Sequence, residues 1–256
     1  MMSSSPLPEP VTTRMRQRHR TESMKAMDKC HQYVTRLFRF GHMDFEFAVW
    51  QMIYLFVSPK KVYRNFQYRK QTKNQFARDD PAFLLLLFVW FVISATGLSL
   101  ALKLHFLGFV KFLFWVVFID CVLVGALVAT LFWFVTNRYM RSSDTEDVEW
   151  GYAFDVHLNA FFPPLLILHV FQLFFYNVFI SEDYFIARLF GNTLWMISVT
   201  YYCYITFLGY SCLAIVRHTQ TILYPLVPLF FVYLVSIIAG INVCRVMMDF
   251  YHYRVY

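Results

Sequence analysis

Hydrophobic residues gather into long runs after residue 81, whereas the first 80 residues mix polar and apolar positions. The first run, PAFLLLLFVWFVISATGLSLAL (81–102), holds no charged residue for 21 positions from Ala82 onward. A helix of that length is long enough to cross the hydrocarbon core of a bilayer, which is roughly 30 Å thick. A buried helix of a soluble domain would carry a polar stripe, and this run offers only hydroxyl groups. The pattern predicts a transmembrane helix over residues 82–102.

The start of this helix is marked by residues that suit a helix N-terminus. Asp79 and Asp80 offer carboxylates to the free backbone amides of the first turn and match the positive end of the helix dipole. Pro81 fits the first turn, where its missing N–H is not needed. We therefore expect a capped helix to begin at about residue 81.

Four later apolar runs predict four more membrane helices. The expected fold is all-α: a polytopic membrane domain (81–256) preceded by a basic amphipathic N-terminal segment. The third run begins near Pro163-Pro164, which predicts a kink or break that membrane helices tolerate. The five spans are expected at about residues 82–102, 112–135, 158–180, 189–216 and 223–244.

The polar residues inside the expected spans include Asp120, His169 and Gln172. A carboxylate within a bilayer is costly and usually faces a partner or water. A proton or ion relay would need further buried ionisable groups, and the spans offer few. We expect these side chains to serve in packing and interhelical hydrogen bonds.

The N-terminal part divides into a basic arm (1–29) and a helical, cytosolic or interfacial segment (30–80). The arm contains RMRQRHR, which is compatible with a tail facing acidic lipid, a nuclear address or a nucleic-acid patch. The apolar stretch that starts at Phe47 is too short to span a bilayer. We expect it to form a helix that lies in the interface or packs under the membrane domain.

Ser58-Pro59 is a strong helix start, and a basic, aromatic-rich helix is expected after it. Such a helix beside a span favours anionic headgroups, by about 1 kcal/mol per Lys or Arg. The same composition could hold single-stranded RNA, whose bases stack on aromatic side chains, but contact with lipid or protein is the default interpretation. The candidate contact residues are Lys60, Lys61, Tyr63, Arg64, Phe66, Arg69, Lys70 and Lys73.

The distribution of Lys and Arg predicts the orientation. With the N-terminus in the cytosol, 18 of these residues fall on the cytosolic side and 5 on the other side. Cytoplasmic loops carry the excess of positive charge. We therefore expect a cytosolic N-terminus and, after five spans, a lumenal C-terminus.

The loop between the second and third spans (137–157) contains an acidic cluster, Asp144–Glu149, which faces either the basic helix or water. Asp155 and His157 invite a catalytic or metal-binding interpretation, but residues two apart do not share a helix face. Zincin, nucleophile-elbow and phosphate-loop motifs are missing from the sequence, as is a cysteine pattern typical of zinc sites. We expect no enzyme activity, no metal and no cofactor.

Three stretches resemble the Unc-fifty (uncoordinated-fifty) family of Golgi membrane proteins, which is distantly similar to Yip-type trafficking proteins. They are YRNFQYRKQTKNQFARDDPAF (63–83), EWGYAFDVHLNAFFPP (149–164) and YITFLGYSCLAIVRHTQTILYPL (204–226). The resemblance extends from about residue 36 to the end of the chain. It implies a five-span Golgi protein with no catalytic residues.

The resemblance also implies partners. Members are associated with recruiting large Arf guanine-nucleotide exchange factors and with delivering nicotinic acetylcholine receptors to the cell surface. An inner nuclear membrane location and RNA binding have been attributed to the family as well. The resemblance, combined with the polar N-terminal part of the chain, predicts a composite docking face made by the N-terminal segment and the loop 141–157. Its expected aromatic anchors are Trp150, Tyr152, Tyr63 and Phe66.

Overall fold

The structure is a computed structural model that describes residues 43–73, 80–142 and 147–255, with 67–73 described by their backbone alone. The described residues are largely helical, with an isolated β-bridge between Arg141 and Val216. The prediction of an all-α protein with several membrane-spanning helices is confirmed. The segments long and apolar enough to cross a membrane are Ala82–Ala101, Phe106–Met140, Trp150–Ile180 and Thr219–Ile238.

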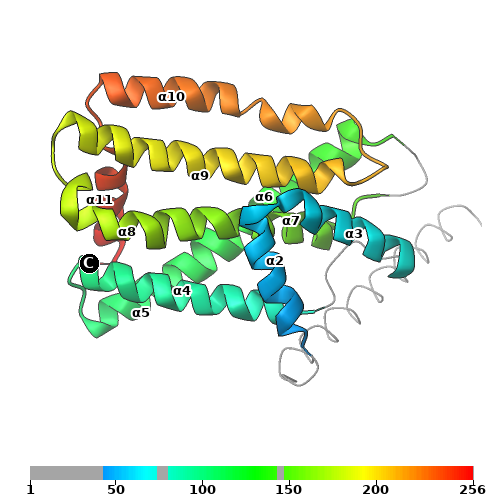
Figure 1. Ribbon diagram of the computed structural model, residues 1–256, viewed down its shortest axis with the longest axis horizontal. Helices are drawn as coiled ribbons and strands as arrows, with labels where there is room; N and C mark the ends of the chain where they lie inside the picture. Colours follow the sequence, from blue (N-terminus) through cyan, green and yellow to red (C-terminus); the bar gives the residue numbers. More distant parts are fainter. Residues whose placement is uncertain (1–42, 74–79, 143–146, 256) are drawn as a thin grey trace, which may run out of the picture.

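Two helices precede the first span: α2 (Phe45–Val57) and α3 (Pro59–Lys73). The Asp44 carboxylate accepts a hydrogen bond from the backbone N–H of Phe47 over 2.9 Å, which caps α2. Ser58 separates the two helices, and Pro59 opens the second as the sequence predicts. Figure 1 shows α2 running across the direction of the membrane spans, with α3 continuing toward one end of the bundle.

The first span is α4 (Ala82–Ala101), and its bounds lie within a residue of the prediction. The second span is longer than the predicted 112–135, since the helix includes Lys111 before that range and Arg138 after it. Two of its stretches are π-helical, a local widening of the helix. The second span consists of α5 (Phe106–Phe114), η2 (Trp115–Leu123), α6 (Val124–Val135) and η3 (Thr136–Met140).

The third span begins at Trp150, eight residues before the predicted start at 158. Pro163 and Pro164 lie inside its first helix, which continues to Leu166. The predicted break at the double proline is therefore absent, and two π-helical stretches follow it instead. The third span consists of α7 (Trp150–Leu166), η4 (Ile167–Phe171), α8 (Gln172–Phe175) and η5 (Tyr176–Ile180).

The last part of the chain forms α9 (Phe185–Ser211), the 3₁₀ helix η6 (Thr219–Leu223), α10 (Leu226–Ile238) and α11 (Val243–Val255). The final apolar helix ends at Ile238 rather than near residue 244, because the chain turns at Gly240, whose φ is 73°. A left-handed φ is readily adopted by glycine. The described residues that follow the expected fifth span lie in α11.

Figure 1 shows the long helices lying side by side along one direction, with α9 between α10 and the α7–α8 segment. The α4 and α5 helices form the opposite edge of this layer. The α2 and α3 helices lie toward one end of the bundle, and α11 and the C-terminus lie at the other. The first and last parts of the described chain are thus placed toward opposite ends.

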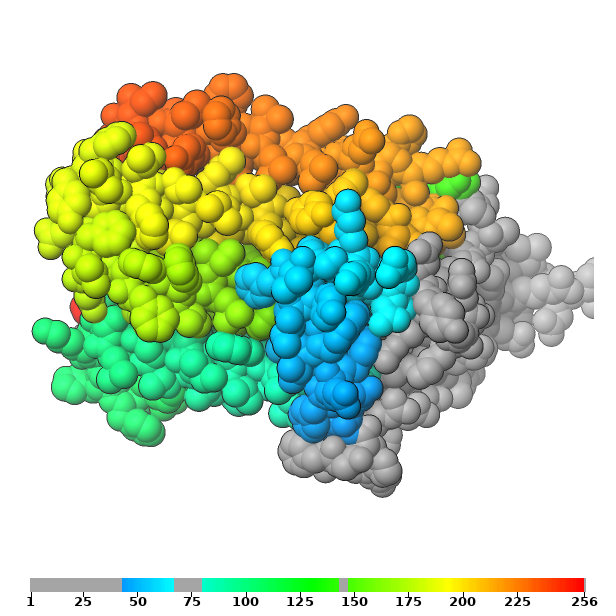
Figure 2. Space-filling model, viewed as in Figure 1, coloured from blue at the N-terminus to red at the C-terminus, as the bar shows by residue number. Residues whose placement is uncertain are grey.

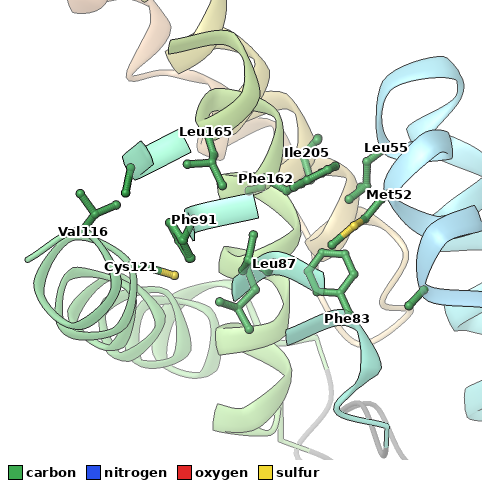
Figure 3. Packing of buried hydrophobic residues seen from close by; sticks show 14 of the residues in the cluster. Met52, Leu55, Phe83, Leu87, Phe91, Val116, Cys121, Phe162, Leu165 and Ile205 are labelled. Carbon is green, nitrogen blue, oxygen red and sulfur yellow. The ribbon is translucent and has the colours of Figure 1, made fainter. Parts of the chain in front are cut away.

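The apolar core lies where α2 meets the spans. Figure 3 shows Phe83, Leu87 and Phe91 of α4 beside Phe162 and Leu165 of α7, with side chains of α2 and α9 closing the cluster. Lipid tails are as apolar as these side chains, so close packing, rather than escape from water, holds spans together. One close approach is made at Gly125, where an added Cβ would lie 2.5 Å from the His157 ring.

Candidate functional site

The α2 helix is fixed to the bundle by three hydrogen bonds between elements distant in sequence. The Gln51 Nε2 group donates to Asn159 Oδ1 of α7 over 2.8 Å, and both side chains are buried. The Tyr201 hydroxyl of α9 lies 2.9 Å from the Leu55 carbonyl and 3.0 Å from that of Phe56, and it donates to this pair of acceptors. The end of α2 therefore has a defined position relative to the spans.

The first turns of α3 expose cations on one side. Lys60, Lys61 and Arg64 are exposed, while Phe66 is half-buried. The first turn of α3 holds no acidic residue, and Lys61 Nζ lies 5.2 Å from the centre of the Tyr54 ring. The three remaining basic residues of this helix belong to the part described by its backbone alone: Arg69, Lys70 and Lys73.

Two of the predicted aromatic anchors are buried instead of exposed. Tyr63 and Tyr152 each expose 3% of their surface. The Tyr152 hydroxyl donates to the Gly209 carbonyl, and a Cβ added at Gly209 would lie 3.3 Å from Tyr63 and 2.7 Å from Val156. Both rings thus pack where α3, α7 and α9 meet. This joint covers both rings, so neither is exposed to a partner in this structure.

The predicted acidic loop is short, running from residue 141 to 149. Asp147 pairs with Arg141, while Asp144 and Glu146 lie outside the described residues. The Asn137 side chain both donates to the Val148 carbonyl (3.1 Å) and accepts from its N–H (2.9 Å). The two described ends of this loop are therefore tied to the end of the second span.

Trp150, the first residue of α7, is the predicted anchor that remains on the surface, with 42% of its area exposed. Its indole Nε1 donates to Thr130 Oγ1 over 3.0 Å, and its ring stacks on Phe154 with an interplanar angle of 9°. The side chain is therefore held in one orientation while a large part of its surface stays exposed.

The start of the first span is connected to α2 by one carboxylate. Asp80 Oδ1 accepts from the Ala82 N–H over 2.9 Å, and Asp80 Oδ2 accepts from the Asp44 N–H over 2.7 Å. Pro81 is buried at the turn between them, and Asp79 lies outside the described residues. Asp80 thus caps α4 and joins its start to the start of α2.

Asp120 pairs with a residue 134 positions away in the sequence. Both of its carboxylate oxygens lie 3.1 Å from Arg254 of α11. The Arg254 guanidinium also lies 4.5 Å from the Trp115 ring centre and 5.1 Å from that of Phe250. Asp120 is therefore part of an interhelical ion pair with aromatic support.

The other two polar residues predicted inside the spans, His169 and Gln172, are buried. His169 Nε2 shares a hydrogen bond of 3.2 Å with the Tyr251 hydroxyl of α11. Burial raises the pKa of Tyr251, so its phenol stays protonated. Together with the Arg254 pair, this contact places α11 against two spans.

His157 forms a hydrogen bond of 2.8 Å between its Nδ1 and the hydroxyl of Tyr202 on α9. Its ring is buried and lies near Gly125 of the second span. Within residues 43–73, 80–142 and 147–255, no group of three His, Cys, Asp or Glu side chains is arranged to hold a metal ion. The geometry here is that of interhelical packing.

Four residues that hold α2 or α11 against the spans were not identified from the sequence: Gln51, Asn159, Tyr201 and Arg254. Each is a polar side chain beside or within an apolar stretch, and buried polar groups require partners. The polar character of these residues was visible in the sequence, but it does not show which residue each of them contacts.

The chain matches a family model described as the UNC-50 family over residues 33–252. It is 54% identical to the protein unc-50 homolog of Drosophila melanogaster over 253 residues, covering 98% of this chain and 90% of the relative. It is 57% identical to the Homo sapiens homolog, covering 89% of this chain and 88% of the relative. It is 53% identical to the Danio rerio homolog, with coverages of 93% and 96%. No solved structure gives a significant match.

Proposed function

The chain belongs to the UNC-50 family, and from this premise we propose that it is a non-enzymatic trafficking factor of the Golgi membrane. Its cytosolic end positions a large Arf guanine-nucleotide exchange factor and thereby supports the delivery of receptors, such as nicotinic acetylcholine receptors, to the cell surface. The exposed, oriented ring of Trp150 is the observation on which we rest the docking site.

The docking face centres on Trp150 and includes the adjacent end of the 141–149 loop and the partly exposed Phe66 of α3. Interface hot spots favour aromatic side chains that are already oriented, since little conformational entropy is then lost on binding. Tyr152, two residues after Trp150, is held at the joint with Tyr63 and Gly209, which fixes the start of α7. A fixed platform of this kind suits a protein that holds a partner in place.

We further propose that α9 is a fifth span, which leaves the N-terminus cytosolic and the C-terminus lumenal. Its 27 residues run along the other spans in Figure 1. Its polar side chains have partners within the bundle, such as Asn192 with Ser236 (2.9 Å) and Tyr202 with His157. A helix surrounded by other helices can be less apolar than one that faces lipid.

Protease protection tests this topology in sealed Golgi vesicles. Added protease should remove a tag placed before Met1 and spare a tag placed after Tyr256, and detergent should make both cleavable. Protection of the N-terminal tag, or equal cleavage of the two tags in intact vesicles, would contradict five spans in this orientation.

The recruiting role is tested by replacing Trp150 with Ala in cells that lack the native protein. Loss of a central aromatic anchor is worth about 2 kcal/mol, a roughly 30-fold loss of affinity. We expect less exchange factor on Golgi membranes while the variant itself stays in the Golgi. Trp133→Ala is the matched control, because Trp133 is similarly exposed on the second span but lies outside the loop.

A separate experiment removes the protein altogether. If the exchange factor remains on Golgi membranes in those cells, the recruiting role is refuted. The RNA-binding alternative would then need its own support. The burial of Tyr63 weighs against it, because that ring is not available for stacking on a base.

A further inference from the structure

The outer face of α2 is apolar from Val49 to Val57, after the exposed Glu46 of its first turn. Val49, Ile53 and Val57 are spaced four residues apart, which aligns them on one side of the helix, and they are 43%, 54% and 74% exposed. The opposite side packs into the core through Met52 and Leu55. A helix on a water-facing surface normally carries polar residues on its outer side.

The position of α2 relative to the bilayer follows from its contacts. Asp80 joins the N-terminus of α2 to the start of α4, the point where the first apolar span begins. Gln51 and Tyr201 then fix the rest of the helix against α7 and α9. Figure 2 shows α2 on the outside of the bundle, uncovered in that view. The apolar stripe therefore lies near the level at which the bilayer surface meets the protein.

The charges that follow the stripe match the chemistry of lipid headgroups. Lys60, Lys61 and Arg64 are exposed directly after the turn at Ser58, and the first turn of α3 has no acidic residue. An apolar stripe followed by cations is the pattern of helices that lie in the membrane interface. Anionic lipids attract such cations by about 1 kcal/mol for each Lys or Arg near the surface.

We propose that α2 and the first turns of α3 form a bilayer-surface binding site for anionic lipids. The stripe of Val49, Ile53 and Val57 lies in the boundary between acyl chains and headgroups. Lys60, Lys61 and Arg64 hold the lipid phosphates. The occupant is lipid because α2 packs against apolar membrane helices and joins the start of the first one, and because the cations complement an anionic surface. The site functions whether or not an exchange factor is bound.

The test uses the full chain in nanodiscs of phosphatidylcholine and phosphatidylserine. A fluorescent amino acid is incorporated at position 53, 57 or 61, one position in each preparation. Bromines on the lipid acyl chains, close to the headgroup, should quench the probe strongly at 53 and 57 and weakly at 61. Iodide in the buffer should show the reverse order.

Two results in this experiment would overturn the proposal. If iodide quenches the probes at 53 and 57 as fully as the probe at 61, the stripe faces water. If neither quencher reaches 53 and 57, protein covers the stripe, and crosslinking would then show whether a second copy provides it.

A second measurement tests the preference for anionic lipid. Phosphatidylserine with a quencher on its headgroup should reduce the emission of the probe at position 57 several-fold more than phosphatidylcholine with the same quencher. The variant Lys60→Glu/Lys61→Glu/Arg64→Glu should lose this preference. The control reverses Lys103 and Arg245, which are exposed cations far along the chain from α3, and should retain it. Equal quenching by both lipids in the unaltered chain would refute the role of the cations.

Discussion

The side chains of Gln51 and Asn159 are joined by a buried hydrogen bond of 2.8 Å that connects α2 to α7 across 108 positions of sequence. Both side chains are almost fully covered, with 1% of each exposed. A buried amide is costly to desolvate unless it is hydrogen-bonded, so this pair favours one placement of α2 over others.

Replacing Gln51 with Leu should destabilise the docked position of α2. The change removes the donor to Asn159 while leaving a buried amide in place, at a cost of about 1–3 kcal/mol. The double variant Gln51→Leu/Asn159→Leu replaces both partners with apolar groups and should recover part of that loss. Thermal unfolding of the purified proteins in detergent measures both. Additive losses in the double variant would show that the two amides do not act as a pair.

Gly209→Ala should push α3 away from the bundle. Its new Cβ would lie 2.7 Å from Val156 and 3.3 Å from Tyr63, so neighbouring side chains must move. Proteolysis within α3 should become faster, since the helix loses its close contact with α9. The second change Val156→Ala removes the nearest atoms and should restore resistance. If the single variant resists protease as well as the unaltered chain, the joint is looser than its geometry indicates.

How far the fold follows from sequence depends on whether a signal is local. The bounds of α4 were predicted within a residue because an uninterrupted apolar run and the acidic residues before it specify both ends. The α11 helix was missed because its apolar and polar residues alternate and form no long run. The start of α11 is held by Asn192, whose Oδ1 accepts a hydrogen bond from the Val243 N–H, 51 positions later in the sequence.

The candidate site was likewise predictable from the sequence only where the signal is local. That the α3 region is basic, and that the first turns of α3 expose their cations, follows from composition and helical spacing. Whether Tyr63 and Tyr152 face a partner or the core is decided by Gly209 on α9, which allows both rings to approach closely. The sequence shows that an aromatic residue is present in a helix. Which residues surround its ring is decided by tertiary contacts, which the sequence does not show.

Asp120→Asn should destabilise the attachment of α11 without abolishing trafficking. Arg254 would keep its charge in a partly buried position and lose its carboxylate, and breaking such a pair costs more than replacing both members. The double variant Asp120→Asn/Arg254→Met should therefore unfold at a higher temperature than Asp120→Asn alone. A trafficking defect in Asp120→Asn at normal protein levels would instead favour a relay role for this carboxylate.

The thiol of Cys244 should report whether α11 is attached. Burial raises the pKa of this thiol to about 12, because the buried site disfavours the charged thiolate. The thiolate is the reactive form, so at neutral pH only about one molecule in 100,000 carries it. Alkylation, followed by peptide mass measurement, should therefore be very slow at Cys244 and become faster as the pH rises toward that value.

The matched control for this measurement is Tyr253→Cys on the same helix, since Tyr253 is 82% exposed. A thiol there has an ordinary pKa of about 8.5, and its thiolate fraction at neutral pH is larger by roughly 3,000-fold. It should react quickly in every variant. In Asp120→Asn, where α11 is less firmly held, reaction at Cys244 should accelerate while reaction at position 253 stays constant. Rapid alkylation of Cys244 in the unaltered chain would show that α11 is not packed against Gly191 as its contacts require.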